Sequence, residues 1–459
     1  MTTHALTPDI FKAYDVRGLY GREIDGDVAE EVGRAFVRVL AERAGRPAGA
    51  LRIGLGHDMR LPAAELAERY RDGMVAEGAH VLDAGMIATE MLYWLVGRRS
   101  LDGGLMCTAS HNPAAYTGAK LVAAGAVALS AQSGLRELRE LLAAGLGTAP
   151  GGGSWERLDI YGEFHAAVCR LVSVVSMRPM TVVLDGGNGM AGPTAGPVLD
   201  VLPLEQVTMG WEPDGTFPRG HEPNPLLPEN RRAVIAAVRA TGAELGIAWD
   251  GDADRCFFVD DTGTFVDGDF ITALLAQSVL AAHPGATIVY DVRSSRAVPD
   301  TVARLGGRAL VNRVGHAFFK ARMRAEGAEF GGEVSGHYYF RGFYNADSGT
   351  LPALLILGLL SRRGATLSEL LAGYRARYFI SGEINSEVGD PAAKLAELAC
   401  RYADGRIDRL DGLSVDYRDW HFNVRPSNTE PLLRLTVESL VSRRDMEQHR
   451  DQLLEVIRS

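Results

Sequence analysis

Three segments of the chain share one pattern, a short apolar strand that ends at an aspartate and is followed by a polar loop and a helical stretch. They read RIGLGHD (52–58), TVVLDGG (181–187) and TIVYDVR (287–293). Strands that alternate with helices at this spacing predict βαβ units and mostly parallel sheets. Ligands on such sheets gather at the carboxyl ends of the strands, so we expect the functional loops to lie there.

The 459 residues are enough for three or four domains. A Gly-rich stretch at 145–154 is typical of a linker, and further breaks are expected near 259–263 and 370–380. The segment WHFNVRPSNTEPLLRLTVES (420–439) alternates apolar and polar residues around a Pro/Ser/Asn/Thr tip, which predicts a β-hairpin, and 442–458 predicts a closing helix. We therefore expect three related α/β domains (1–153, 154–259 and 260–371) and a smaller α+β C-terminal domain (372–459).

The formal net charge of -10 argues against a nucleic-acid partner, although a few local arginines can still hold a small phosphate. The longest central apolar run, 351–360, is too short to span a bilayer and predicts a core helix. The N-terminal residues contain no apolar signal-peptide segment. Four cysteines without a CxxC pair are expected to be small buried hydrophobes in a reducing compartment. These features predict a cytoplasmic protein without a membrane partner.

The hexapeptide Asp250-Gly-Asp252-Ala-Asp254-Arg255 lies between two apolar stretches, LGIAW and CFFV. Three carboxylates at alternate positions in a tight loop repel one another, and a hard divalent cation relieves that repulsion by binding their oxygens. With only three carboxylates supplied, the cation keeps open positions, which Mg²⁺ typically uses for water and a phosphate. The loop therefore predicts a magnesium site.

The same loop has other interpretations besides a magnesium site. The simplest is a solvated turn. A calcium EF-hand needs Gly at the sixth loop position, where Arg255 stands, and Glu at the twelfth, where Asp261 stands. A haloacid-dehalogenase loop would need Thr or Val in place of Asp254.

A second candidate is Thr108-Ala-Ser110-His111-Asn112-Pro113, followed by Lys120. A serine hydroxyl is a weak nucleophile unless a base or a metal assists it, and here a histidine adjoins it. On its own the segment is an ordinary Asn-Pro turn. A metal loop with open positions strengthens the functional interpretation of this segment. A phosphate on Ser110 would carry about -1.5 to -2 charges, which the magnesium can bind.

Two further loops have the composition of ligand sites. The loop Arg425-Pro-Ser427-Asn428-Thr429-Glu430, with Arg434 beyond it, combines guanidinium, hydroxyl and amide groups that suit a phosphate. Its alternative is a plain hairpin tip. The stretch GGEVSGH (331–337) offers polar groups for sugar hydroxyls but is a weak signal by itself.

A glycine pattern at 187–192 matches GxGxxG after a strand and suggests a dinucleotide site. The acid expected at the end of the next strand is not evident, and Pro193 interrupts the expected helix. A tight strand-to-helix turn is the favoured interpretation, and a nicotinamide-dependent dehydrogenase remains a rival.

Five motifs in order resemble those of the α-D-phosphohexomutase family, and within it the bacterial phosphomannomutase/phosphoglucomutase branch. They are FKAYDVRG (11–18), TASHNP (108–113), DGDADR (250–255), GEVSGH (332–337) and RPSNTEP (425–431). The resemblance covers essentially the whole chain. It implies three related α/β domains and a smaller fourth domain around a central cleft, in agreement with the pattern of strands and helices.

The resemblance also implies roles for individual residues. Ser110 corresponds to the phosphoserine and a metal ligand, Asp250, Asp252 and Asp254 to the magnesium ligands, His111 and Lys120 to the proton-handling residues, and Arg255 to the residue that closes the metal loop. Substrate-binding positions are Tyr14, Arg17 and His316 in the cleft, Glu333, Ser335 and His337 for the sugar hydroxyls, and Arg425, Ser427, Asn428 and Thr429 for the non-reacting phosphate.

The implied activity is that of an intramolecular phosphotransferase. It would interconvert hexose 6-phosphate and hexose 1-phosphate with Mg²⁺, through a hexose 1,6-bisphosphate that also acts as activator. The implied partner is a small phosphosugar, and we expect a monomer or weak dimer. A non-catalytic phosphosugar sensor is the remaining rival, and a pure binder has no use for both Ser110 and Lys120.

Two departures bear on the sugar. Val334 stands where this branch often has Met, and Thr117 stands where Asn often precedes the Gly-x-Lys. The GExSGH loop with His337 resembles the mannose/glucose branch. Glucosamine mutases, which usually carry Gln at the position of Val334 and Ser-Ala-Ser-His-Asn-Pro in the serine loop, rank second.

Overall fold

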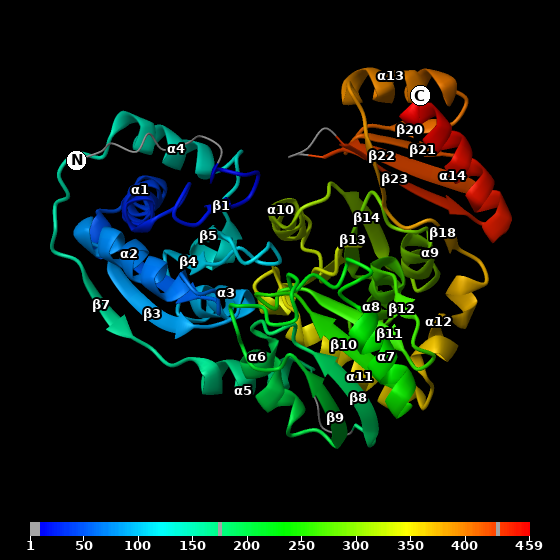
Figure 1. Ribbon diagram of the computed structural model, residues 1–459, viewed down its shortest axis with the longest axis horizontal. Helices are drawn as coiled ribbons and strands as arrows, with labels where there is room; N and C mark the ends of the chain where they lie inside the picture. Colours follow the sequence, from blue (N-terminus) through cyan, green and yellow to red (C-terminus); the bar gives the residue numbers. More distant parts are fainter. Residues whose placement is uncertain (1–9, 173–176, 428–431) are drawn as a thin grey trace. The chain divides into compact units, whose positions relative to one another are not determined.

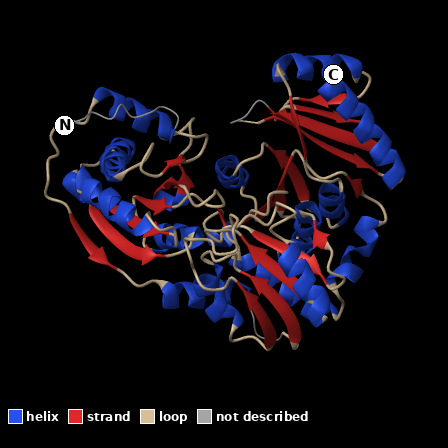
Figure 2. Ribbon diagram, in the orientation of Figure 1, coloured by secondary structure: helices blue, strands red, loops and turns tan. Residues whose placement is uncertain are grey.

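The computed structural model describes residues 10–172, 177–427 and 432–459 (Figure 1). The chain divides into two compact units, one formed by 1–265 with 337–364 and the other by 266–336 with 365–459. Both units are built from β-sheets flanked by helices (Figure 2).

The N-terminal part of the first unit is a sheet of short strands: β1 (Val16–Leu19), β2 (Arg52–His57), β3 (His80–Met86), β4 (Gly103–Cys107), β5 (Tyr116–Ala123), β6 (Val127–Ala128) and β7 (Ser154–Arg157). The strand order is β1-β5-β4-β2-β3-β7, with β6 paired to β5. Strands β4, β2, β3 and β7 pair in parallel, whereas β5 runs antiparallel to β4, β1 and β6. The carboxyl ends of β2 and β4 therefore open at the same edge, where the serine loop begins.

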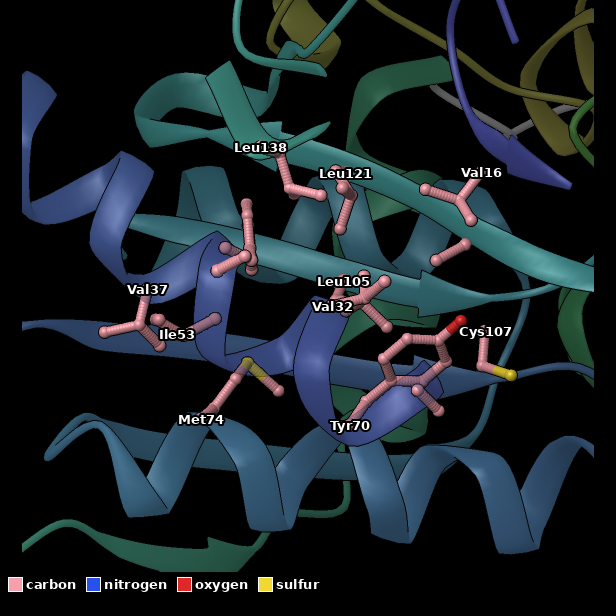
Figure 3. Close-up of a cluster of buried hydrophobic side chains, with 14 of the residues drawn as sticks. Val16, Val32, Val37, Ile53, Tyr70, Met74, Leu105, Cys107, Leu121 and Leu138 are labelled. Carbon is pink, nitrogen blue, oxygen red and sulfur yellow. The ribbon is translucent and has the colours of Figure 1, made fainter. Parts of the chain in front are cut away.

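Helices α1 (Gly26–Ala44), α2 (Ala63–Ala76), α3 (Thr89–Arg98) and α4 (Leu135–Ala144) accompany this sheet. Asp25 caps α1 by accepting a hydrogen bond from the Val28 amide, and Gly45 ends it in the left-handed conformation. Figure 3 shows Val32 of α1 and Tyr70 and Met74 of α2 packed near the strand residues Ile53 and Leu105. This core holds the edge of the sheet rigid.

The rest of the first unit contains strands β8 (Met180–Asp185), β9 (Leu204–Met209), β10 (Leu245–Trp249), β11 (Cys256–Asp260) and β12 (Phe265–Val266). Their order is β12-β11-β10-β8-β9; β10-β8 and β8-β9 are parallel pairs, and β10-β11 is antiparallel. The helices are α5 (Tyr161–Val172), α6 (Ala191–Leu199), α7 (Arg232–Thr241) and α11 (Thr350–Arg363). A hairpin of β16 (Tyr338–Phe340) and β17 (Ala346–Asp347) precedes α11, the buried helix predicted over 351–360.

The second unit begins with α8 (Gly268–Ala282), β13 (Thr287–Asp291), α9 (Ala297–Arg304), β14 (Arg308–Asn312), α10 (His316–Glu326) and β15 (Phe330–Gly332), and α12 (Leu367–Arg375) joins them later in the chain. Strand β13 lies between β14 and β15 and is parallel to both. This is the third strand-helix segment predicted from the sequence, and its strand β13 ends at Asp291 as expected.

The C-terminal part of the second unit is a sheet with helices packed against it: β18 (Phe379–Ile380), β19 (Ile384–Glu387), α13 (Pro391–Arg401), β20 (Arg406–Asp408), β21 (Leu413–Asp416), β22 (Trp420–Pro426), β23 (Leu432–Ser439) and α14 (Arg443–Arg458). Strands β22 and β23 form the predicted hairpin, with Arg425 opposite Arg434. Helix α14 is the predicted closing helix. Figure 1 shows α13 and α14 beside this sheet, and both contribute to its buried cluster.

The fold class of α/β domains with a smaller α+β C-terminal domain is confirmed. Cys107 and Cys256 are buried as expected, but the expectation is wrong for Cys169, which is half-buried, and for Cys400, which is exposed on α13. Among the described helices, none combines the length and the apolar character needed to cross a membrane.

Helices α1 and α2 approach each other closely where each has a glycine. A Cβ added to Gly73 would lie 2.0 Å from the Glu30 carbonyl oxygen, and one added to Gly33 would lie 2.3 Å from that of Tyr70. Alanine normally favours a helix by about 1 kcal/mol over glycine. We expect Gly73→Ala to destabilise the protein instead, because the two helices must separate to make room for the added Cβ. The free energy of unfolding should fall by about 1–3 kcal/mol.

Urea unfolding followed by circular dichroism measures this change. Gly162→Ala in α5 is the control, since an added Cβ there meets no atom within 4 Å. A Gly73→Ala protein as stable as the Gly162→Ala protein would show that the helix contact is looser than described.

Candidate active site

The loop 250–255 connects the antiparallel strands β10 and β11, which places three carboxylates in a tight turn. Asp250, Asp252 and Asp254 are buried, and their carboxylate oxygens approach within 4.8 Å of one another. The Oδ1 atoms of Asp252 and Asp254 are buried and accept no hydrogen bond from the residues that the structure describes. A cation would satisfy such buried acceptors, so the residues fit a divalent metal ion.

Lys120 on β5 faces the same carboxylates. Its Nζ donates hydrogen bonds to Asp252 Oδ2 at 2.6 Å and to Asp254 Oδ2 at 2.5 Å. Burial alone would lower the pKa of Lys120, but the two carboxylates outweigh burial and raise the pKa above its ordinary value. Lys120 is therefore a held ammonium group that carries a proton.

Ser110 follows β4 in the loop between β4 and β5. Its backbone is in the left-handed region, with φ of 50°, which is uncommon for a residue other than glycine. The hydroxyl donates to Asp250 Oδ2 at 3.2 Å, and His111 Nδ1 lies 3.2 Å from the same Oγ. Burial and the nearby Arg255 and Arg17 cations hold the pKa of His111 well below its usual value, so the imidazole is neutral.

Arg255 closes the metal loop from the side of β11. Its Nε donates to Asp250 Oδ2 at 2.8 Å and its backbone amide donates to Asp250 Oδ1 at 3.1 Å. Arg255 also forms an antiparallel bridge with His337, whose Nδ1 lies 3.1 Å from Asp347 Oδ2 and 3.9 Å from Asp254 Oδ1. The first unit thus brings His337 to the metal loop.

The N-terminal motif contributes to the same region through Arg17. Its guanidinium donates to Asn112 Oδ1 at 2.5 Å and pairs with Asp15. Tyr14 is half-buried in the turn that precedes β1. The first unit therefore groups the predicted residues Arg17, Ser110, His111, Lys120, Asp250, Asp252, Asp254, Arg255 and His337.

The second unit contains a cluster of arginines around one carboxylate. Glu383 accepts hydrogen bonds from Arg425 Nη2 at 3.1 Å, Arg293 Nη1 at 3.2 Å and Arg434 Nη1 at 3.4 Å. Burial opposes ionisation of Glu383, but the three arginines lower its pKa to about 2. The Ser427 amide donates to the Leu432 carbonyl at 2.8 Å. Asn428 and Thr429 lie outside the described residues.

Glu333 follows β15 in the second unit and is fully buried. Its Oε2 accepts a hydrogen bond from the Gly315 amide at 2.9 Å and lies 3.9 Å from Arg293 Nη2. Gly315 precedes α10, whose first residue is His316, so Glu333 and His316 come from neighbouring backbone. Ser335 is half-buried two residues after Glu333. The predicted motif GEVSGH is divided, because His337 belongs to the first unit.

Sequence reasoning missed several polar residues of these clusters. Thr89, the first residue of α3, donates from Oγ1 to Asp252 Oδ2 at 2.5 Å and from its amide to the Asp252 carbonyl at 3.1 Å. Asp347, Arg293 and Glu383 were also missed. Only Arg293 carried a signal, because it comes two residues after Asp291 at the carboxyl end of a predicted strand.

The GxGxxG stretch packs against the metal loop, and backbone amides of this turn donate to carbonyls of the chain itself. A Cβ on Gly189 would lie 2.5 Å from the Gly251 carbonyl oxygen. The Met190 amide donates to that same carbonyl at 2.9 Å, and the Asn188 amide donates to Gly210. The turn is therefore occupied by the chain's own backbone, which agrees with the structural interpretation of this motif.

Comparison with known proteins places these clusters in one family. Phosphoglucomutase/phosphomannomutase family models match in order: alpha/beta/alpha domain I at 8–144, domain II at 160–263, domain III at 267–378 and the C-terminal domain at 383–456. A phosphomannomutase of Salmonella montevideo is 41% identical over 98% of this chain and 99% of its own. Phosphohexose mutases of Xanthomonas campestris pv. campestris are 42% identical over 95% of this chain and 96% of theirs.

Solved structures agree with the sequence comparison. A phosphoglucomutase/phosphomannomutase family protein from Burkholderia thailandensis superposes with a TM-score of 0.88 at 34% identity, covering 97% of this chain and 96% of that one. The acidic triad, the adjoining serine and lysine, and full-length similarity thus lead to one conclusion. The chain belongs to the phosphoglucomutase/phosphomannomutase family and is a phosphohexomutase.

Proposed function

We propose that the chain interconverts hexose 6-phosphate and hexose 1-phosphate of mannose and/or glucose, with phosphoserine 110 as the phosphoryl carrier. The observation that carries this proposal is the hydrogen bond from Ser110 Oγ to Asp250 within a triad of buried carboxylates. This contact places the hydroxyl beside the carboxylates that would hold a cation, which supports chemistry at its oxygen.

In the proposed reaction, phosphoserine 110 donates its phosphoryl group to the free hydroxyl of a hexose monophosphate. The bond between phosphorus and Ser110 Oγ breaks, and the bond between phosphorus and the sugar oxygen forms. The sugar hydroxyl gives up its proton, and Ser110 Oγ takes up a proton. The product is a hexose 1,6-bisphosphate. After this intermediate turns over, Ser110 takes the other phosphoryl group, and the sugar oxygen regains a proton.

Two residues can move that proton. His111 is neutral and its Nδ1 lies 3.2 Å from Ser110 Oγ, so it can accept a proton, although its lowered pKa makes it a weak base. Lys120 carries a proton that Asp252 and Asp254 hold tightly, so its donation requires these contacts to loosen. This division of roles is part of the proposal.

Phosphoryl transfer depends chiefly on positioning and on neutralising the charge of the phosphoryl oxygens. Asp250, Asp252, Asp254 and Ser110 would hold a Mg²⁺ ion, which would supply positive charge to a phosphoryl oxygen when bound. Arg255 and Lys120 supply fixed positive charge of their own at the same carboxylates.

We assign the non-reacting phosphate to the arginine cluster of the second unit. Arg425 and Arg434 share the carboxylate of Glu383, while Arg293 also pairs with Asp291. The two guanidinium groups that share one carboxylate favour an anion, and paired N–H groups of arginine match phosphate oxygens. The proposal adds Ser427, Asn428 and Thr429 from the family motif. Arg293 joins this group on the strength of its contact with Glu383.

Recognition of the sugar is assigned to Glu333, Ser335 and His337, with Tyr14, Arg17 and His316 in support. We further propose a hexose 1,6-bisphosphate as activator, a cytoplasmic location, and a monomer or weak dimer. Turnover of mannose 1-phosphate, glucose 1-phosphate and glucosamine 1-phosphate, compared with a trace of the matching bisphosphate, tests the proposed function. Faster turnover of glucosamine 1-phosphate would overturn the mannose/glucose assignment.

If Ser110 carries the phosphoryl group, purified protein will contain a population heavier by one phosphate, localised to the peptide that contains Ser110. Ser110→Ala will bind substrate but lose nearly all turnover, because the oxygen that accepts phosphorus is gone. Intact mass, peptide mapping and steady-state assays measure these outcomes. Ser130→Ala, in the same domain, is expected to retain activity. Wild-type turnover by Ser110→Ala contradicts the assignment.

Asp252→Asn is expected to leave the fold intact and lower kcat by on the order of a hundredfold or more, since the amide cannot replace a carboxylate on a hard cation. Isothermal titration with MgCl₂ should show weakened binding. The control is Asp83→Asn, which neutralises a buried carboxylate paired with Arg71 and Arg157. Equal Mg²⁺ affinity in the Asp252→Asn and wild-type proteins would remove this residue from the metal site.

Arg425→Ala is expected to raise KM by roughly ten- to a hundredfold, because it loses a charge-assisted hydrogen bond worth about 1.5–3 kcal/mol. The matched control is Arg406→Ala, which removes an exposed arginine of the same sheet that pairs with Asp416. Substrate titration of initial rates distinguishes the two variants. An unchanged KM and kcat for Arg425→Ala would count against the phosphate-site assignment.

A further inference from the structure

Arg60, in the loop after β2, is a buried residue that binds the serine loop through backbone carbonyls. Its Nη2 donates to the carbonyls of Ser110 at 2.9 Å and Asn112 at 2.6 Å, and its Nη1 donates to those of Pro113 at 2.9 Å and Tyr116 at 3.0 Å. One guanidinium thus satisfies four acceptors within seven consecutive residues. A planar group with five donors can do this, and an ammonium group cannot.

The start of the serine loop is held by the same segment. The Arg60 amide donates to Asp58 Oδ1 at 2.9 Å, and Asp58 Oδ2 accepts the Thr108 hydroxyl at 2.6 Å. The Thr108 oxygen in turn accepts the Ser110 amide at 2.8 Å. Both the amide and the carbonyl of Ser110 are therefore fixed from the loop that follows β2.

Ser110 needs such support because its backbone is strained and its surroundings are tight. A serine with φ of 50° persists only where neighbouring contacts hold it. On the other side of its carbonyl, a Cβ added to Gly251 of the metal loop would lie 2.6 Å from the Ser110 oxygen. The Phe217 ring, with its centroid 5.4 Å from the Arg60 guanidinium carbon, packs near the remaining part of the guanidinium.

We propose that Arg60 is a positioning residue for phosphoryl transfer, which fixes Ser110 so that its Oγ meets the metal loop at Asp250. This inference rests on the proposed function of Ser110. Arg60 acts through the backbone and does not touch the substrate. Its loss therefore affects the chemical step and leaves substrate binding at the arginine cluster of the second unit unaffected.

The test compares Arg60→Lys with Arg38→Lys in the same domain. Arg38 also joins a buried carboxylate, Glu77, to a backbone carbonyl, that of Leu146, and has no part in the proposed reaction. For Arg60→Lys we expect kcat to fall on the order of ten- to a hundredfold with KM within about twofold of wild type, because a displaced nucleophile costs rate and not binding. Arg38→Lys should keep the wild-type kcat and KM, even if the substitution lowers the thermal stability of the protein.

A second readout follows the serine directly. Glucose 1,6-bisphosphate is added to dephosphorylated protein, and intact-mass spectrometry follows the addition of phosphate, which should slow in Arg60→Lys by the same factor as kcat. If Arg60→Lys does not fold, Thr108→Val tests the same restraint from the other end of the loop and should show the same separation of kcat from KM.

The outcomes separate the two levels of the proposal. The positioning role is overturned if folded Arg60→Lys keeps the wild-type kcat and phosphorylation rate. If Arg60→Lys does not fold, the same result in Thr108→Val overturns it. In both cases the proposed function stands. A raised KM at unchanged kcat also overturns the positioning role. A wild-type protein without turnover and without phosphate on Ser110 overturns the proposed function, and the positioning role with it.

Discussion

The mutual repulsion of three buried carboxylates is the constraint on which the first unit depends. Two carboxylates within 4.8 Å repel by about 3.5 kcal/mol at an effective dielectric constant of about 20, and burial removes the water that would screen them. Lys120 and Arg255 neutralise part of this charge, and the Thr89 hydroxyl at the start of α3 donates to Asp252. Strands and a helix from distant parts of the chain are thus tied to one six-residue loop.

Close backbone contacts keep this loop in place. Gly189 leaves room for the Gly251 carbonyl, which accepts the Met190 amide, while Gly251 leaves room for the Ser110 carbonyl. Three loops consequently meet through backbone atoms, and the side chains of Ser110 and Asp250 are positioned by that contact. Metal binding and the geometry of the serine are therefore expected to be coupled, since the two loops are in close backbone contact.

Much of the fold and the centre of the site could be predicted because their signals are local. Alternating strands and helices give the α/β plan, the spacing of Asp250, Asp252 and Asp254 indicates a cation, and the pairing of β22 with β23 follows from the alternation within 420–439. Thr89 and Asp347 could not be identified, because each acts through a contact with a segment far away in the sequence. Arg60 comes two residues after Asp58, as Arg293 does after Asp291, but its contacts with the serine loop are visible only in the structure. No sequence motif marks Glu383, and its role becomes visible only when folding brings three arginines to its carboxylate.

The arginine cluster of the second unit shows why such a carboxylate is useful. Arg425 and Arg434 stand directly opposite each other on β22 and β23, and like charges in that arrangement destabilise a sheet. Glu383 offsets the repulsion and holds both side chains, together with Arg293, in one place. The three long side chains lose their conformational entropy when the protein folds. An incoming anion therefore does not have to order them, and it binds more tightly. Arg293 also pairs with Asp291, so Glu383 is left to face Arg425 and Arg434. One carboxylate does not neutralise these two guanidinium groups, and they stay attractive to an anion even while Glu383 remains bound to them.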